Sequence, residues 1–276
     1  MRKPPDKPPR RWTAAPLMLA SAGVHMGAAA ATVAYPRLWP WTLGAVALNH
    51  VALAGAGLWP RSQWLGPNWT HLPAPAGAAS VAITIDDGPD PDVTPKVLAQ
   101  LAEHGAVATF FCIGERVERF ADLAREIVRR GHSIENHSQH HRHNFSLLGP
   151  RAMGGEIARA QDTIQRITGT RPRFFRAPAG LRNPFLEPVL ARLELRLASW
   201  TRRGFDTVNK DADAVYRRLI HALQGGDILL LHDGNAARGA RGNPVILDVL
   251  PRLLGTLQSQ QLRAITLRSA LPVDCG

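Results

Sequence analysis

Two adjacent aspartates, Asp86 and Asp87, directly follow a run of β-forming residues in the segment ITIDDGPD, residues 83–90. Neighbouring carboxylates repel each other. The energetic cost of this repulsion is small only in open water, or where a cation or a shared proton relieves it. A cation held by one of them leaves the other free to act as a base toward water. The pair therefore suggests a metal site.

A second group of possible metal ligands lies in GHSIENHSQHH, residues 131–141. If this segment turns into a helix, His137 and His141 lie on one face about one turn apart, which suits a single metal ion. His140 and His143 are close enough in sequence to replace either of them. A histidine-rich surface loop would have the same composition, so the pair alone leaves both interpretations open.

Two further apolar runs end in ionisable residues. FFRAPAG, residues 174–180, contains Arg176, and LLLHD, residues 229–233, ends in His232 and Asp233. Ionisable residues at the ends of four apolar runs are difficult to explain by packing. One carboxylate and two imidazoles form a three-ligand site with room for water, which is the pattern of catalytic zinc. Asp233 is interpreted as a turn residue.

The elements that must position these residues alternate between strand-like and helix-like patterns. Such alternation predicts parallel strands in an α/β architecture, as an open sheet or an incomplete barrel of seven strands. Active residues then gather at the carboxyl ends of the strands. The predicted strands are 81–85, 107–113, 133–136, 173–177, 195–200, 228–231 and 263–267, and the predicted helices are 93–104, 155–168, 212–223 and 244–258.

The chain is strongly basic, with 33 Lys and Arg against 22 Asp and Glu and a formal charge of +11. The basic residues are scattered, and no basic run or aromatic stacking motif typical of nucleic-acid binding is present. No nucleic-acid partner is therefore predicted. The excess is interpreted as a solvated arginine-rich surface, with an anionic membrane surface or polymer as the alternative. The two cysteines do not form a disulfide framework.

The N-terminal part of the chain differs from the rest. Residues 1–11 form a polar, basic, proline-rich tail, and residues 12–60 contain two uncharged apolar stretches on either side of Arg37. Each stretch approaches the roughly 20 residues that a membrane-spanning helix needs. Two transmembrane helices are the favoured interpretation. A single anchor with the second stretch in the interface, and a cleaved signal peptide, are the alternatives.

The number of crossings decides where the remainder of the chain lies. A basic N-terminus favours a cytoplasmic start, so two spans return the chain to the cytoplasm and one span places it outside. The prediction is therefore attachment to a bacterial-type inner membrane, with the side left open. Residues 61–79 are predicted to be a linker rich in Pro, Gly and Ala, and residues 80–276 a catalytic domain.

The four motifs ITIDDGPD, HSQHH, FRAPAG and LLLHD, in this order, resemble the polysaccharide deacetylase family, also called the NodB-homology or carbohydrate esterase 4 family. The resemblance covers about residues 81–267, and its first two motifs are highly specific together. It implies a distorted (β/α)7-type barrel, a divalent metal that is usually zinc, and hydrolysis of an acetyl group from a sugar.

The resemblance also implies a role for each matching residue. The fourth motif of the family is an aspartate usually followed by Trp, and its best match is WTRRGFDT, residues 200–207. The implied roles are Asp86 as catalytic base, Asp87, His137 and His141 as metal ligands, Arg176 as the partner that holds Asp86, His232 as general acid, Asp206 as the carboxylate that tunes His232, Leu230 as part of the acetyl pocket, and Ala179 as the backbone N–H donor to the oxyanion.

Two positions depart from the family pattern. The family commonly has Arg-Pro-Pro-Tyr-Gly where this chain has RAPAG, and Thr207 replaces the usual Trp. Both changes remove aromatic surface from the sugar groove but no catalytic group. The predicted function is therefore a membrane-anchored metal-dependent hydrolase that removes N-acetyl groups from a glycan, either an N-acetylglucosamine-containing polysaccharide or peptidoglycan.

Three alternatives remain from the sequence. A deacylase or deformylase of a lipid-linked sugar and an O-acetyl esterase of polysaccharide keep the same chemistry. A catalytically inactive carbohydrate-binding protein belongs to a different class, but a protein that only binds needs neither an acid nor a base.

Overall fold

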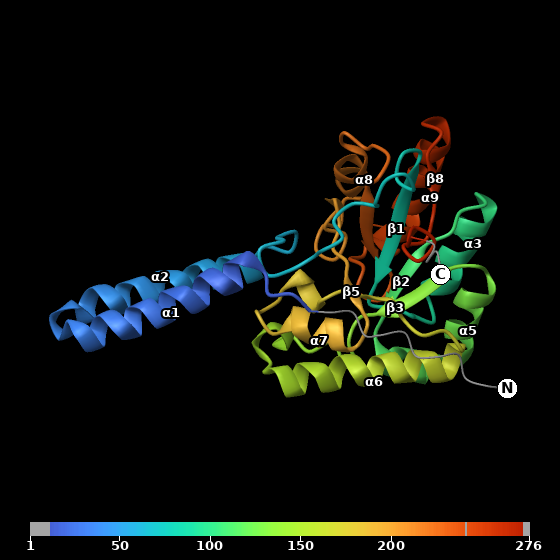
Figure 1. Cartoon of the computed structure of the whole chain (residues 1–276). Coiled ribbons are helices and arrows are strands. Elements are labelled where there is room, and N and C mark those ends of the chain that lie inside the picture. The colour runs from blue at the N-terminus through green and yellow to red at the C-terminus, as the bar shows by residue number, and fades with distance from the viewer. Residues whose placement is uncertain (1–11, 241, 273–276) are drawn as a thin grey trace.

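The computed structural model describes residues 12–240 and 242–272. The predicted basic tail, residues 1–11, lies outside this range. Figure 1 shows an α/β domain from which a long helical hairpin projects. The hairpin contains the apolar N-terminal stretches, and the domain contains all four motifs.

The centre of the domain is a parallel sheet in the order β5-β4-β3-β2-β1-β7-β6, with β8 paired to β1. The register aligns Asp86 of β1 with His232 of β7. Among the described residues, β5 and β6 do not pair with each other, so the expected barrel is an open half-barrel. The strands are β1 Ser80–Asp86, β2 Thr109–Cys112, β3 Ser133–Asn136, β4 Phe174–Phe175, β5 Arg196–Leu197, β6 Arg202–Arg203, β7 Ile228–His232 and β8 Arg263–Ala264.

The central strands are covered on both sides, as strands of a parallel sheet are. Every residue of β1 and of β7 is buried. Their Val, Ile and Leu side chains on one face pack under α3, α8 and α9, and the other face encloses a smaller cluster around Phe111, Phe174 and Leu230. This packing fixes the strand ends, and therefore the polar residues that follow them.

Helices follow most strands, as the alternating pattern predicts. The predicted helices match α3 Thr94–Glu103, α6 Pro150–Thr168, α8 Ala212–Ile220 and α9 Val245–Ser259. Three shorter helices, α4 Gly114–Arg119, α5 Ala121–Arg129 and α7 Leu186–Arg192, were not predicted. Strand β6 was not predicted either, because a strand of two arginines carries no hydrophobic signal.

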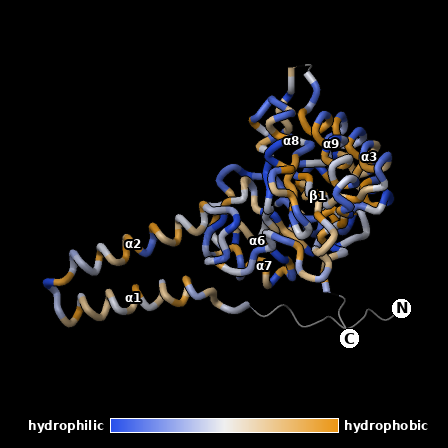
Figure 2. The backbone as a smooth tube through the Cα atoms, turned by 90° about the horizontal axis from the view of Figure 1, so that it is seen from above, coloured by the Kyte–Doolittle hydropathy of each residue, from blue (hydrophilic) through white to orange (hydrophobic). Residues whose placement is uncertain are grey.

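The hairpin consists of α1, Pro16–Ala34, and α2, Trp39–Leu58, joined by a short turn, η1 Pro36–Leu38. Figure 2 shows mostly pale to orange colours along both helices, with a hydrophilic turn at the far end. Their polar side chains meet between the helices: Asn49 Nδ2 donates to Ser21 Oγ at 2.9 Å, and the hydroxyls of Thr32 and Thr42 lie 2.8 Å apart. Most of the outer surface is therefore apolar, with His25 and His50 as exposed polar side chains.

Segments Pro16–Ala34 and Pro36–Leu58 are long and apolar enough to cross a membrane by length and composition. Only 6% and 17% of the residues in their apolar windows are buried, so these helices do not belong to the core of the domain. A signal sequence passes the same test of length and hydropathy. The region is therefore compatible with a membrane anchor.

Residues 61–79 connect the hairpin to β1 and pack against the domain. Leu65, Asn68 and Leu72 in this segment are buried. Trp69 pairs with Ala198 beyond the end of β5, and the Trp69 backbone N–H donates to the Leu197 carbonyl at 2.9 Å. The base of the hairpin is thereby held close to the edge of the half-barrel.

Candidate active site

The carboxyl ends of the central strands open into one cavity of about 190 Å³. Parallel strands place their carboxyl ends at the same edge of a sheet, so side chains distant in sequence meet there. The predicted site residues that line this cavity are Asp86, Asp87, His137, His141, Ala179, Leu230 and His232. Arg176 and Asp206 are hydrogen-bonded to Asp86 and His232 and are buried.

Asp87, His137 and His141 bring three ligand atoms within 4.8 Å of one another. Asp87 Oδ1 lies 3.3 Å from His137 Nε2 and 3.2 Å from His141 Nε2. His137 Nδ1 donates to the carbonyl oxygen of Arg176 at 2.8 Å, which leaves Nε2 as the nitrogen with a free lone pair. Such a hydrogen bond is the usual way in which a protein orients a histidine ligand.

These residues fit a divalent metal ion. Asp87 Oδ1 is buried without a hydrogen-bond partner, which is costly unless something outside the described side chains satisfies it. Ligands about 2.0–2.1 Å from a tetrahedral zinc ion lie about 3.3 Å from each other, close to the two Asp87–histidine distances. Two imidazoles and one carboxylate are a donor set that zinc prefers.

The electrostatics of Asp87 and His141 agree with this fit. Burial lowers the pKa of His137, but the carboxylates of Asp86 and Asp87 outweigh burial and raise that pKa, so a metal ion would have to displace a proton from this ring. Burial raises the pKa of Asp87, but the adjacent His137, together with the charges of His232 and His141, outweighs burial and holds that pKa far below its ordinary value. Burial and the neighbouring His137 lower the pKa of His141 to about 4. Asp87 is therefore ionised and His141 neutral near pH 7, as metal ligands must be.

The two histidines lie on a loop and not on a helix, so the expected helical arrangement is wrong. The loop follows β3, and both Ser138, with φ 64°, and His141, with φ 48°, adopt left-handed backbone conformations. The loop, rather than the pitch of a helix, brings the rings to 4.8 Å between centres. Asp87 is also left-handed, with φ 74°. Such conformations in non-glycine residues often mark functional sites.

Asp86 is held by a buried ion pair. Arg176 Nη1 donates to Asp86 Oδ1 at 2.6 Å and to Thr84 Oγ1 at 2.8 Å, and Arg176 is only 1% exposed. The other guanidinium nitrogens also donate: Nε to the carbonyl oxygen of Ala198 and Nη2 to that of Ser199. A buried charge is stable only when its donors are hydrogen-bonded and a counter-ion is close by, as they are here. Asp86 Oδ2 lies 3.9 Å from His137 Nε2, close to the ligand group.

His232 is held by a second buried carboxylate. Asp206 Oδ1 accepts from His232 Nδ1 at 2.8 Å, and Asp206 Oδ2 accepts from the His232 backbone N–H at 2.7 Å. Burial lowers the pKa of His232, but the charge and hydrogen bond of Asp206 outweigh burial and raise that pKa to about 9. The ring is therefore protonated at neutral pH, and Nε2 is the nitrogen left for a substrate.

The remaining wall of the cavity combines apolar groups and a tight turn. Ala179, with φ 55°, lies in the turn Pro178–Gly180 (η3), and Leu230 lies on β7 two residues before His232. Trp200 also lines the cavity. This residue supplies aromatic surface in a wall where Ala179 and Thr207 have none.

Sequence reasoning missed Trp200 as a cavity residue, and it also missed Asn235 and Arg203. Asn235, in the loop after β7, donates from Nδ2 to Asp87 Oδ2 at 2.9 Å, and Arg203 of β6 lines the same wall as Trp200. The rule that sites gather at strand ends would have found Asn235 three residues after His232. Arg203 lies on a strand that the sequence did not reveal.

Asp233 lies in the bend that follows β7, as expected of a turn residue, but its side chain is buried. It is 2% exposed, and Thr94 Oγ1 donates to its Oδ2 at 2.5 Å. Burial, opposed by this hydrogen bond and strengthened by the nearby charges of Asp87 and Asp90, raises the pKa of Asp233 to about 7. The side chain supports the loop of Gly88, since a Cβ at Gly88 would lie 2.6 Å from both Asp233 oxygens.

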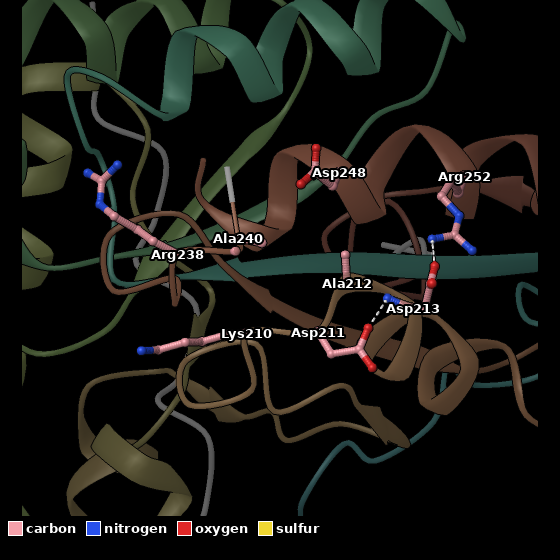
Figure 3. Close-up of a pocket in the computed structure, with 9 residues that line it drawn as sticks. Lys210, Asp211, Ala212, Asp213, Arg238, Ala240, Asp248 and Arg252 are labelled. Atoms are coloured by element: carbon pink, nitrogen blue, oxygen red, sulfur yellow. Dashed lines mark hydrogen bonds and ion pairs between the residues drawn. The ribbon is translucent and has the colours of Figure 1, made fainter. Parts of the chain in front are cut away.

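A larger depression of about 870 Å³ lies between the starts of α8 and α9 (Figure 3). Its charges are largely engaged within the fold: Asp211 caps α8, and Arg252 Nη1 pairs with Asp213 Oδ1 at 2.6 Å. In Figure 3, Lys210 and Arg238 point away from these pairs. The depression brings no acid, base and metal-ligand set together, unlike the cavity at the strand ends.

Comparisons with known proteins agree with this geometry. The sequence profile described as "Polysaccharide deacetylase" matches residues 74–198. A peptidoglycan-N-acetylglucosamine deacetylase from Bacillus cereus is 32% identical over 193 residues, which cover 69% of this chain and 87% of that protein. A chitooligosaccharide deacetylase from Sinorhizobium fredii is 35% identical over 159 residues, covering 57% and 74%.

A solved structure has the same fold. The family 4 carbohydrate esterase from Streptomyces lividans, in complex with acetate, superposes with a TM-score of 0.62 at 31% sequence identity. The match covers 71% of this chain and 97% of that one. The half-barrel is thus a fold that the two proteins share.

Proposed function

Because the chain belongs to the polysaccharide deacetylase family, we propose that it hydrolyses the N-acetyl group of an amino sugar in a glycan. One observation carries the proposal. Asp86 and His232 are register partners on adjacent strands, each bonded to its own buried counter-ion, and both line the cavity of the three metal-ligand residues. An acid and a base on either side of a metal site suit hydrolysis of an amide.

Asp87, His137 and His141 would hold the metal ion, with zinc as the ion that the donor set favours. When bound, a divalent ion polarises a carbonyl group and makes water more acidic. Asn235 holds Asp87 through Oδ2, so that Oδ1 faces the two imidazoles.

Asp86 is the proposed general base. Arg176 occupies its Oδ1, and Oδ2 lies on the side of the ligand residues. Oδ2 takes a proton from the attacking water as the water oxygen bonds to the acetyl carbon. Arg176 keeps the carboxylate in one orientation, and such orientation lowers the entropic part of the barrier.

His232 is the proposed general acid. Its proton passes from Nε2 to the sugar nitrogen as the carbon–nitrogen bond breaks, so the products are acetate and a free amine. Asp206 stabilises the imidazolium that must donate, in the manner of a buried carboxylate that orients a catalytic histidine. The pKa of about 9 keeps His232 protonated in the free enzyme near pH 7.

Ala179 and Leu230 are proposed to hold the acetyl group. Leu230 offers an apolar surface to the methyl group, and the backbone N–H of Ala179 donates to the oxygen that gains charge. Trp200 is proposed to stack against the sugar ring, where the family commonly places other aromatic residues.

We propose further that α1 and α2 anchor residues 80–276, as the catalytic domain, to a bacterial-type inner membrane. The support is the largely apolar outer surface of the hairpin and the polar contacts between its helices, since polar side chains in membrane helices face one another. Two crossings place both ends of the chain on one side. Protease protection of a tag at each end, in sealed vesicles, should therefore give the same result for both tags. Opposite results, or loss of the N-terminal tag by processing, would rule out the hairpin.

The test of the enzymatic function uses the full chain in detergent micelles. The protein is stripped with a chelator and reloaded with one equivalent of zinc, and acetate release is measured from N-acetylglucosamine oligomers, peptidoglycan and lipid-linked N-acetylglucosamine. Zinc-dependent release from any of these is the expected result. Full zinc binding without release from any acetylated substrate would contradict the proposal.

A further inference from the structure

Arg203 has an unusual environment in the wall of the cavity. Its guanidinium carbon lies 5.3 Å from the ring centre of Trp200 and 4.9 Å from that of Phe205. Its Nε is buried and has no hydrogen-bond partner, and no ion pair joins it to any carboxylate in the described part of the chain. The positive charge is thus held between two aromatic rings and left uncompensated.

Two other arginines of the domain are paired with carboxylates. Arg176 pairs with Asp86, and Arg202, the neighbour of Arg203 on β6, pairs with Asp227 at 2.5 Å. At these two positions the supporting arginine has a carboxylate partner within the fold. Arg203 lines the substrate cavity and has no such carboxylate among the described residues. A charged side chain in a cavity wall without a counter-ion is costly to hold there, so the counter-charge is expected to come from the substrate.

The positive charge continues beyond the cavity. Arg203 also lines an adjoining groove of about 570 Å³ with Phe205, Arg217 and Arg218 of α8, and no Asp or Glu lines that groove. Arg217 and Arg218 are exposed and form no ion pair with any described residue, and the Arg218 guanidinium lies 5.5 Å from the ring centre of Phe205. Three uncompensated arginines therefore extend from the reaction centre to the surface.

The base of the hairpin packs against this same wall. Ser199 Oγ donates to the carbonyl oxygen of Pro60 at 2.6 Å, and a Cβ at Gly180 would meet both Pro60 and Trp200. Arg61 Nη1 donates to the carbonyl oxygen of Thr201, which lines the groove. The cavity consequently opens within a few residues of the end of α2, and with α1 and α2 in a membrane it lies at the membrane surface.

We propose that the substrate carries a phosphate group beside the acetylated sugar, and that Arg203 binds this phosphate, with Arg217 and Arg218 along its path. The inference rests on the proposed deacetylase function and names its substrate class: an N-acetylated sugar joined through phosphate to a membrane lipid. Arginine forks match phosphate oxygens in geometry and charge. The phosphate is assigned to a lipid because the base of the hairpin lies beside the cavity, which places the cavity at the membrane surface.

The test compares two substrates that differ only in the phosphate. One is N-acetylglucosamine joined through phosphate to a short prenyl chain, and the other is the prenyl glycoside without phosphate. The zinc-loaded full chain in micelles is expected to deacetylate the phosphate substrate with at least a tenfold higher kcat/KM. Arg203→Gln should lower kcat/KM for the phosphate substrate about 10- to 100-fold, as the loss of a charge-assisted hydrogen bond does, and bring the ratio toward one.

Two further variants keep the test informative if Arg203→Gln folds poorly. The double variant Arg217→Gln/Arg218→Gln changes only exposed side chains on α8 and should also lower the ratio. Arg159→Gln removes the same charge from an exposed position on α6, which lines neither the cavity nor the groove, and should leave the ratio unchanged.

Equal efficiencies for the two substrates in the wild-type protein, or equal losses for both substrates in the arginine variants, would overturn the inference while leaving the deacetylase function in place. Soluble N-acetylglucosamine 1-phosphate separates the sources of phosphate: if it is used as well as the prenyl substrate, the lipid part of the inference is wrong. If no substrate releases acetate, the enzymatic function itself fails. Calorimetric binding of the phosphate substrate, compared between wild type and Arg203→Gln, then still tests the phosphate site.

Discussion

Asn235 Nδ2 lies 2.9 Å from Asp87 Oδ2, and this hydrogen bond leaves Asp87 Oδ1 directed at both imidazoles of the ligand group. The contact joins the loop after β7 to the loop after β1. It fixes which carboxylate oxygen is available to a metal ion, and a carboxylate oriented in this way binds a metal more tightly than a mobile one.

We therefore expect Asn235→Ala to weaken zinc binding about 10- to 100-fold, since this is the usual effect of removing a residue that orients a metal ligand. Competition with a chromophoric chelator measures the affinity without any need for turnover. Asn243→Ala, at an exposed position in the same segment, is the matched control. Unchanged zinc affinity in Asn235→Ala would show that Asp87 needs no such support.

Asp86→Asn should separate chemistry from metal binding. Asp86 is proposed as base and not as ligand, so the variant should retain one equivalent of zinc but lose about 100- to 10,000-fold in kcat/KM, the range that general base catalysis contributes. Acetate release and zinc content are measured on the same preparation. An unchanged rate would remove Asp86 from the mechanism, and loss of zinc would make it a ligand.

The pH dependence should follow the pair of His232 and Asp206. A general acid works only when protonated, so kcat/KM should be maintained as pH rises until the pKa of His232, about 9, and should fall above it. In Asp206→Asn the main influence that raises this pKa is lost while burial still lowers it, so the alkaline decrease should move to lower pH. A pH profile of kcat/KM for both proteins checks this, and a limb that does not move would exclude His232 as the acid.

Asp233 should make stability depend on pH in the opposite direction from a salt-bridged aspartate. Between its ordinary pKa of 3.8 and its raised pKa of about 7, the folded state holds a proton that the unfolded state has released. Stability therefore decreases as pH rises through this interval. Asp233→Asn keeps an acceptor for Thr94 but cannot ionise, so its Tm relative to wild type should be higher at about pH 8 than at about pH 5.

Thermal melts of the full chain in micelles at both pH values measure this difference. Asp122→Asn, at a fully exposed side chain, should show no comparable pH dependence relative to wild type. A Tm difference for Asp233→Asn that is independent of pH would mean that Asp233 is ionised throughout.

The sequence by itself determined the local parts of this protein. Alternating apolar runs indicated the parallel strands, and the rule that sites lie at the carboxyl ends of strands indicated Asp86, His137, Arg176 and His232, because both signals are carried by residues near one another in the chain. The motif order gave the family. Short elements such as β6 were not predicted, because two residues are too few to show an alternating hydrophobic pattern.

Tertiary structure alone decided how these parts meet. A left-handed loop, and not a helix, brings His137 and His141 together, since backbone conformations at single residues such as Ser138 leave no pattern in the sequence. The partnership of Asn235 with Asp87 joins positions 148 residues apart. The burial of Asp233 and the unpaired charge of Arg203 depend on which groups the fold places around them, and only packing in three dimensions sets those surroundings.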